Sequence, residues 1–190
     1  MKRVSVFCGS SHGTDKVFEA QAYELGKLLA ERNIELVYGG TNVGLMGAVA
    51  NGALEHGGKV IGVVPECISS KGIAHTGLTE LILVDTMHQR KAKMYDLSDG
   101  IITLPGGYGT LEELFEILTW AQLGLHKKPV AILNIDYFYD ALLSHIHKMV
   151  NKGFMKDANK EMLIVSHDME EMLEKMECYK APVVDKWIKK

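Results

Sequence analysis

The chain has 190 residues, of which 47% are hydrophobic and 24% are charged, and its formal net charge is −3. This length and composition predict one globular domain over residues 1–190 with a sizeable core. A mildly acidic chain lacks the basic surface that drives binding to DNA or RNA, which excludes nucleic acid as the main partner. No stretch reaches the ~18 apolar residues that cross a bilayer, so we expect no contact with a membrane.

The cysteines and histidines exclude two further classes of protein. Cys8, Cys67 and Cys178 are far apart in the sequence and form no C-x-x-C pair. A disulfide framework and a zinc site are therefore not expected, and a reducing cytoplasm is the expected location. His145 and His147 face different ways on a predicted helix, so we predict no metal site there. Cys8 follows an apolar strand and is interpreted as a small buried hydrophobe.

Strand-like and helix-like segments alternate along the first half of the chain. Apolar strands are predicted over residues 3–8, 34–38 and 59–64. A helix is predicted to begin near Thr14 or Asp15, and a second, rich in small residues, to end near His56. Residues 66–79 lack periodicity and are predicted to form the longest loop.

The alternation continues to the end of the chain. A short strand is predicted over 81–84, a helix over 87–97 and a strand over 100–104, and a further helix follows Thr110. Two more strands, 129–134 and 162–165, are each followed by a helical segment.

Strands that are apolar throughout and alternate with helices indicate a parallel sheet covered on both faces. Right-handed crossovers then give a doubly wound, Rossmann-like α/β fold. In such sheets ligands bind beyond the carboxyl ends of the strands. Glycine-rich turns follow the first, second and fifth predicted strands, so the ligand site is predicted at this edge.

The turn after the second strand, Gly39-Gly40-x-x-Gly44-x-x-Gly47, resembles a dinucleotide-binding fingerprint. In that fingerprint the glycines follow the first strand, and an acidic residue ends the second. Here the next strand ends in Val64-Pro65, which disfavours a nicotinamide-dependent dehydrogenase. Glycines that allow a helix to pack closely on a strand are the alternative interpretation.

The turn at residues 105–110 carries the strongest signal. Gly106, Gly107 and Gly109 leave backbone N–H groups bare at the start of a helix, where the partial positive charge attracts anions. The Thr110 hydroxyl can donate to a phosphate oxygen. We therefore predict a phosphate-binding turn, with a mononucleotide as its ligand.

The residues after this turn also fit a purely structural interpretation. Thr110-Leu111-Glu112-Glu113 matches a capping box, in which Thr110 and Glu113 satisfy each other's backbone N–H groups. Glu113 lies about opposite the helix's apolar stripe. On the pattern alone, Glu113 is then a helix cap or a solvated charge.

The predicted helix over 87–97 carries independent information. Met87, Arg90, Lys91 and Met94 are spaced to share one helix face. A guanidinium among methionines either extends to solvent or meets an anion inside the protein. Because this helix precedes the strand that leads to the glycine turn, Arg90 can reach the same pocket.

Two motifs together, Pro105-Gly106-Gly107-x-Gly109-Thr110-x-x-Glu113 and Met87-His88-x-Arg90-Lys91-x-x-Met94, resemble the signature of the LOG family. These enzymes are cytokinin riboside 5′-monophosphate phosphoribohydrolases, often labelled lysine decarboxylases. The resemblance extends from residues 6–10 to 120–124. It implies a homodimeric Rossmann-like hydrolase that cleaves the N-glycosidic bond of an adenine-type nucleoside 5′-monophosphate, releases the base and ribose 5-phosphate, and uses no cofactor or metal.

The resemblance also implies roles for individual residues. Arg90 and Glu113 are the implied catalytic pair, since a carboxylate can stabilise an oxocarbenium-like ribose or activate water. The fixed charge of Arg90 can hold the substrate and assist the leaving base. The implied substrate contacts are Arg90, Lys91, Gly106, Gly107, Tyr108, Gly109, Thr110, Leu111, Glu112 and Thr119.

The chain departs from the family pattern at Gly72, where many members have a glutamate, which leaves the base or ribose preference open. A nucleotide- or cofactor-binding module without turnover is the main alternative function. An AMP nucleosidase that ignores the N6-prenyl group is another. A pyridoxal-dependent decarboxylase is disfavoured because nothing singles out a Schiff-base lysine.

Overall fold

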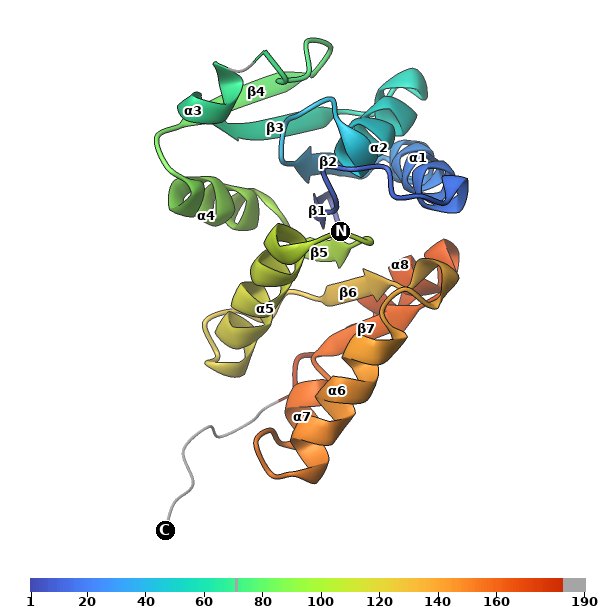
Figure 1. The fold of residues 1–190 in the computed structure, drawn as a ribbon, viewed down its shortest axis with the longest axis vertical. Helices are drawn as coiled ribbons and strands as arrows, with labels where there is room; N and C mark the ends of the chain where they lie inside the picture. The colour runs from blue at the N-terminus through green and yellow to red at the C-terminus, as the bar shows by residue number, and fades with distance from the viewer. Residues whose placement is uncertain (71, 183–190) are drawn as a thin grey trace.

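The computed structural model describes residues 1–70 and 72–182, and these form a seven-stranded sheet in the order β4-β3-β2-β1-β5-β6-β7 (Figure 1). Every pair of neighbouring strands is parallel. The strands are β1 (Arg3–Phe7), β2 (Glu35–Tyr38), β3 (Val60–Pro65), β4 (Glu80–Val84), β5 (Gly100–Thr103), β6 (Val130–Leu133) and β7 (Leu163–Ser166). The predicted doubly wound, Rossmann-like fold is confirmed.

Helices cover both faces of the sheet (Figure 1). One hydrophobic cluster joins the sheet to α1 (Lys16–Glu31), α2 (Gly44–Glu55) and α8 (Met169–Glu177). The other joins it to α4 (Met87–Leu97), α5 (Tyr108–Gln122) and α6 (Asp140–Asn151). Short helical segments are α3 (Glu66–Ser69), η1 (Ile135–Tyr137) and α7 (Asp157–Lys160). Among the described residues, no helix is long and apolar enough to span a membrane.

The predicted strands agree with the observed ones to within one residue at each end, and helix 87–97 agrees at both ends. Two predictions were wrong. The segment 66–79 contains the short helix α3, which is too brief to show a periodic pattern. Helix α5 begins at Tyr108 rather than after Thr110, because Gly107 already takes the extended N-cap conformation.

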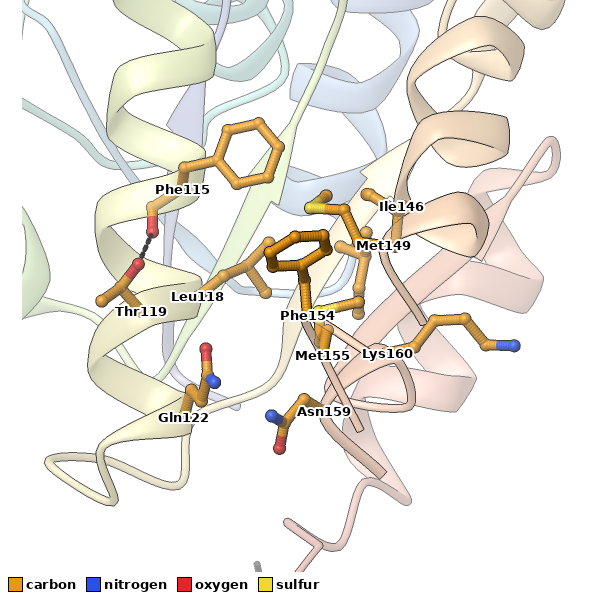
Figure 2. Close-up of a pocket in the computed structure, with 11 residues that line it drawn as sticks. Phe115, Leu118, Thr119, Gln122, Ile146, Met149, Phe154, Met155, Asn159 and Lys160 are labelled. Atoms are coloured by element: carbon orange, nitrogen blue, oxygen red, sulfur yellow. Dashed lines mark hydrogen bonds between the residues drawn. The ribbon is translucent and has the colours of Figure 1, made fainter. Parts of the chain in front are cut away.

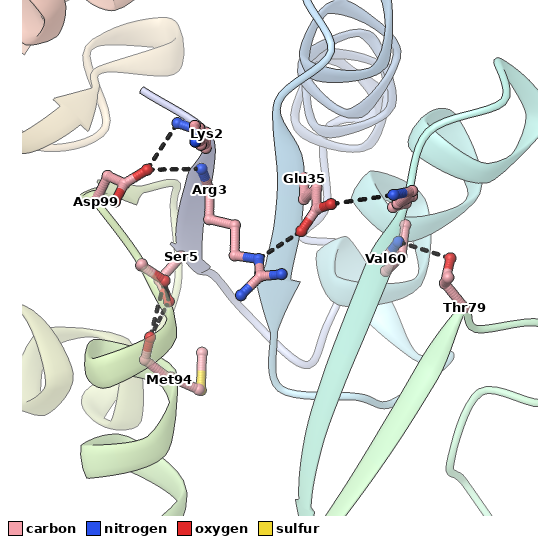
Figure 3. Close-up of polar contacts among 10 residues, drawn as sticks. Lys2, Arg3, Ser5, Glu35, Val60, Thr79, Met94 and Asp99 are labelled. Atoms are coloured by element: carbon pink, nitrogen blue, oxygen red, sulfur yellow. Dashed lines mark hydrogen bonds and ion pairs between the residues drawn. The ribbon is translucent and has the colours of Figure 1, made fainter.

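Polar contacts fix α4 against β1 (Figure 3). The Ser5 hydroxyl donates to the Met94 carbonyl oxygen at 3.0 Å. After the helix, the Asp99 carboxylate accepts the backbone N–H groups of Lys2 and Arg3 at 2.7 and 3.0 Å. These contacts set the depth of α4 on the sheet, and so they position the cations that this helix carries.

Strands β2 to β4 are added on one side of β1 and strands β5 to β7 on the other, so the direction of winding reverses between β1 and β5. The chain segments that leave these two strands are joined by a hydrogen bond of 3.0 Å from the Gly9 N–H to the Pro105 carbonyl. The buried Tyr139 hydroxyl donates to the Leu104 carbonyl at 2.8 Å and so anchors the start of the glycine turn. Ligands of open α/β sheets bind at such a reversal point.

Candidate active site

Arg90 and Glu113 meet between α4 and α5. Nη1 of Arg90 donates to Oε1 of Glu113 at 2.6 Å, and the two side chains are only 10% and 9% exposed. Nε of Arg90 donates to the Val63 carbonyl at the end of β3, at 3.2 Å. A charge-assisted hydrogen bond in a buried setting is strong and directional. The structure therefore brings together the predicted catalytic pair and fixes its geometry.

The surroundings of Glu113 change its acidity. Burial raises the pKa of Glu113 above the usual glutamate value, and the positive charge of Arg90 opposes this rise. A buried carboxyl group with a raised pKa, held by a fixed cation, has the properties of a general base or of an electrostatic stabiliser. The same carboxylate faces the buried Cys8. Burial, and to a lesser extent the negative charge of Glu113, raise the pKa of the Cys8 thiol.

Both structural interpretations of Glu113 are wrong. The N-cap of α5 is Gly107 and has no side-chain cap hydrogen bond, so Thr110 and Glu113 do not form a capping box. Glu113 is buried rather than solvated, because α4 supplies a cation on the helix side opposite the apolar stripe.

The predicted helix face of α4 is right for Arg90, Lys91 and Met94, which are buried. It is wrong for Met87, which is 44% exposed at the first position of the helix.

Lys91 lies beside this pair and is itself buried. Its Nζ contacts the Glu112 carboxylate, and it lies 3.1 Å from Oε1 of Glu116. Burial acts to lower the pKa of Lys91, but hydrogen bonds to Glu112 and Glu116 outweigh it and raise that pKa. Lys91 is therefore a cation already paired with two carboxylates of α5.

The glycine turn leaves the start of α5 open. A Cβ atom added to Gly107 or Gly109 would meet no heavy atom within 4 Å, and Tyr108 is 94% exposed. Gly106 differs, since a Cβ there would lie 2.7 Å from the buried Thr110 Cβ. The first N–H groups of a helix have no partner within that helix. The turn thus has the form expected of an anion site.

A cavity of about 340 Å³ lies beside the turn, at the reversal point of the sheet. It is lined by residues 9–13 after β1 and by the 105–107 segment after β5. Phe18, Leu45 and Phe138 supply its apolar walls. Arg90 and Glu113 are not among its lining residues, so this cavity and the buried pair share no wall residue.

Thr119 is not brought to the Arg90–Glu113 pair. Its hydroxyl donates to the Phe115 carbonyl at 2.6 Å, and it lines a different cavity of about 180 Å³ between α5, α6 and α7 (Figure 2). Phe154 and Met149 lie opposite it there. Six positions after Glu113, Thr119 lies ~9 Å further along the helix axis. Leu111 is half-buried and packs against the core.

Gly72 lies in the loop before β4 and has a φ of +71°. The residues after it pair with the turn that follows β2: the Asn42 N–H donates to the Ile73 carbonyl at 3.0 Å, and the His75 N–H to the Gly40 carbonyl at 2.9 Å. The loop is therefore held close to the carboxyl end of β2. In the described part of the chain, no group of three or more His, Cys, Asp or Glu side chains is arranged to hold a metal ion.

Solved structures share this fold at low sequence identity. A molybdenum cofactor binding protein from Rippkaea orientalis has a TM-score of 0.71 and 22% identity, and the match covers 93% of this chain and 96% of that one. A molybdenum cofactor carrier protein from Chlamydomonas reinhardtii has a TM-score of 0.69 and 19% identity, covering 94% and 99% of the two chains. At this identity the likeness concerns the fold alone.

Curated relatives are much closer in sequence. A probable cytokinin riboside 5′-monophosphate phosphoribohydrolase of Oryza sativa subsp. japonica is 49% identical, over 94% of this chain and 73% of the relative. A cytokinin riboside 5′-monophosphate phosphoribohydrolase of Arabidopsis thaliana is 43% identical, over 100% of this chain and 88% of the relative. A family model described as possible lysine decarboxylase matches residues 46–176. On this sequence evidence, the chain belongs to the LOG family, within the proteins described as possible lysine decarboxylases.

Proposed function

We propose that the chain hydrolyses the N-glycosidic bond of cytokinin riboside 5′-monophosphates, with AMP as a further substrate, and releases the free base and ribose 5-phosphate. The observation that carries this proposal is the buried hydrogen bond between Arg90 and Glu113. Glu113 lies on α5, the helix that starts at the open glycine turn. The names of relatives that match nearly the whole chain support the same reaction.

The glycine turn is proposed to hold the 5′-phosphate. The N–H groups of Gly107, Tyr108, Gly109 and Thr110 begin α5, and the helix dipole adds to their attraction for an anion. The adjoining cavity of about 340 Å³ offers room beside the phosphate. The other predicted substrate contacts are Lys91, Leu111, Glu112 and Thr119. Lys91 must break an ion pair with Glu112 or Glu116 of α5 before its Nζ can bind the substrate.

The chemistry follows from the two side chains. When the bond between ribose C1′ and base N9 breaks, its electron pair leaves with the base and positive charge grows on the ribose. The Glu113 carboxylate stabilises that charge and accepts a proton from the water that attacks C1′. The base takes up a proton as it leaves, so the elements of one water molecule are divided between the products. Arg90 keeps Glu113 oriented and adds a fixed positive charge beside the reaction.

Cytoplasmic location and homodimeric assembly belong to the same proposal. Cys8, Cys67 and Cys178 are all free thiols, as in proteins of a reducing compartment. Leu125 and Phe154 are 66% and 85% exposed, and the proposed dimer contact would bury side chains of this kind. Light scattering coupled to gel filtration measures the assembly directly.

The test is base release, measured by chromatography. The protein is incubated with isopentenyladenosine monophosphate, AMP and the unphosphorylated isopentenyl riboside. Release from the prenylated monophosphate but not from the riboside supports both the reaction and the phosphate turn. The AMP rate then gives the base preference. No release from any of the three would refute the proposal and favour a binding module.

A further inference from the structure

Gly39, directly after β2, lies against the guanidinium of Arg90. A Cβ atom at position 39 would overlap Nη2 of Arg90, and it would lie 3.2 Å from Cζ and 2.7 Å from the Met46 Sδ. Cβ atoms in proteins essentially never approach another heavy atom to less than 3.0 Å. The guanidinium therefore occupies the space that a side chain at position 39 would need.

Other groups hold the remaining sides of the same guanidinium. The Val63 carbonyl accepts from Nε at 3.2 Å, and Glu113 accepts from Nη1 at 2.6 Å. Arginine is a long side chain that loses much rotamer freedom when it is fixed. Gly39 and the Val63 carbonyl form a socket (the Arg90 socket) that leaves few of the arginine rotamers available.

The backbone at position 39 does not itself demand glycine. Gly40, its neighbour, has a φ of +74°, which side chains rarely adopt, whereas the φ of Gly39 lies outside the positive range. The φ of Gly39 therefore does not require glycine. The steric requirement for glycine at this position comes from Arg90 and Met46, not from the turn.

We propose that Gly39 is a positioning residue of the reaction, whose missing side chain forms the socket that aims Arg90 at Glu113. The inference rests on the proposed function in one respect, namely that Glu113 acts on the substrate. Alanine at position 39 pushes the guanidinium off Glu113 while the phosphate turn at 106–110 stays unchanged.

A displaced guanidinium also alters the titration of Glu113. The charged and titratable groups that face Glu113 are Arg90 and Lys91 from α4, Glu112 from its own helix and Cys8, directly after β1. Burial raises the pKa of Glu113 and Arg90 opposes the rise. With Arg90 displaced that pKa rises further, so the acidic limb of kcat moves to higher pH.

The test is a double-mutant cycle on the full chain, with isopentenyladenosine monophosphate as substrate. Gly39→Ala is expected to lower kcat by about 100-fold, the loss typical of a small misplacement at a reacting centre, with KM changed by less than about threefold. Lysine has no Nη2, and the close contact that remains is with the flexible end of Met46, so Gly39→Ala in the Arg90→Lys background is expected to cost little beyond Arg90→Lys itself. Gly77→Ala is the matched control and is expected to keep wild-type kcat, because a Cβ at Gly77 would approach only side-chain atoms, those of the His75 ring at 3.2 Å and of Leu54 at 4.0 Å.

Wild-type kcat in Gly39→Ala, or an equal loss in both backgrounds, would overturn the inference. If Gly39→Ala does not fold but the double variant does, the clash with the guanidinium is demonstrated. If neither folds, Gly39 serves the fold and the inference fails. The same double-mutant cycle can be measured by thermal unfolding, which needs no substrate. If the wild type releases no base, the proposed function is refuted. The coupling between Gly39→Ala and Arg90→Lys in Tm then still tests whether Gly39 makes room for the guanidinium.

Discussion

Nη1 of Arg90 and Oε1 of Glu113 are 2.6 Å apart, although the two residues are 23 positions apart in the chain. The contact joins the first turn of α4 to the second turn of α5, and Arg90 also donates to the Val63 carbonyl of β3. Removing one partner of a buried ion pair leaves the other charge without compensation. The pair is therefore best tested by substitutions that keep its shape and change its charge.

Glu113→Gln is such a substitution. The glutamine carbonyl can still accept from Arg90, so we expect the fold to persist while base release falls by at least about 100-fold through loss of the carboxylate. Base release is measured by chromatography, with circular dichroism as the check on folding. Glu174→Gln, an exposed change on α8, is the control and keeps wild-type turnover. Wild-type rates in Glu113→Gln would remove Glu113 from the mechanism.

The pH dependence of kcat reports the same group. The ionised carboxylate is the active form, and burial holds the pKa of Glu113 above the usual value of 4.5 although Arg90 opposes the rise. Activity is therefore expected to be lost, as pH falls, at a pH above that of an ordinary glutamate. The measurement is kcat at saturating substrate from about pH 4 to about pH 9. A profile that stays flat down to the usual glutamate pKa would contradict the burial of the acting group.

Gly109→Ala is expected to move stability and activity in opposite directions. A Cβ at position 109 meets no heavy atom within 4 Å, and the residue lies in the first turn of α5. Alanine in place of a helical glycine stabilises a fold by about 0.5–1 kcal/mol. The same methyl group narrows the approach of a phosphate to the helix N-terminus, so KM for the monophosphate is expected to rise by about tenfold or more. On one preparation, thermal unfolding measures the expected gain in stability and steady-state kinetics measure the expected rise in KM. An unchanged KM would place the phosphate elsewhere.

Asp99→Asn probes the anchoring of α4. Burial acts to raise the pKa of Asp99, but the N–H groups of Lys2 and Arg3 outweigh it and hold the pKa below the ordinary value of 3.8. A lowered folded-state pKa stabilises the protein above the unfolded value, and that stability is lost as pH falls through the folded value. We expect the free energy of unfolding of the variant to be lower by at most about 1 kcal/mol near neutral pH, because Asp99 is exposed and solvent screens its contacts. Urea unfolding at neutral and acidic pH checks this, because the difference between variant and wild type should vanish in acid.

The sequence predicts the fold well because the local signals agree. The start of helix 87–97 is sharply defined because Thr86 is an N-cap residue, whose hydroxyl accepts the Gln89 N–H at 3.2 Å. The strands have unbroken apolar runs between turn residues, which buried parallel strands require. Short helices such as 66–69 and 157–160 were not predicted, because one turn is too short for a periodic signal.

The site is less predictable because its contacts are tertiary. Periodicity places Glu113 opposite the apolar stripe of α5, and nothing local indicates that Arg90 covers that side. Gly39 looks like a turn glycine in the sequence, while its requirement comes from a side chain on α4. Thr119 shares a helix with Glu113, and only the structure shows that it lines a different cavity.

The ion pairs of Lys91 have a consequence for substrate capture. Arg90 and Lys91 are matched by three carboxylates, of Glu112, Glu113 and Glu116, so this cluster carries a net charge of −1 when all are ionised. Such a cluster gives a phosphate dianion no long-range attraction, and the short-range partial charge at the start of α5 must supply it. Salt screens separated charges far more than contacts at a helix terminus. Nucleotide affinity in this protein is therefore expected to stay nearly constant as ionic strength rises.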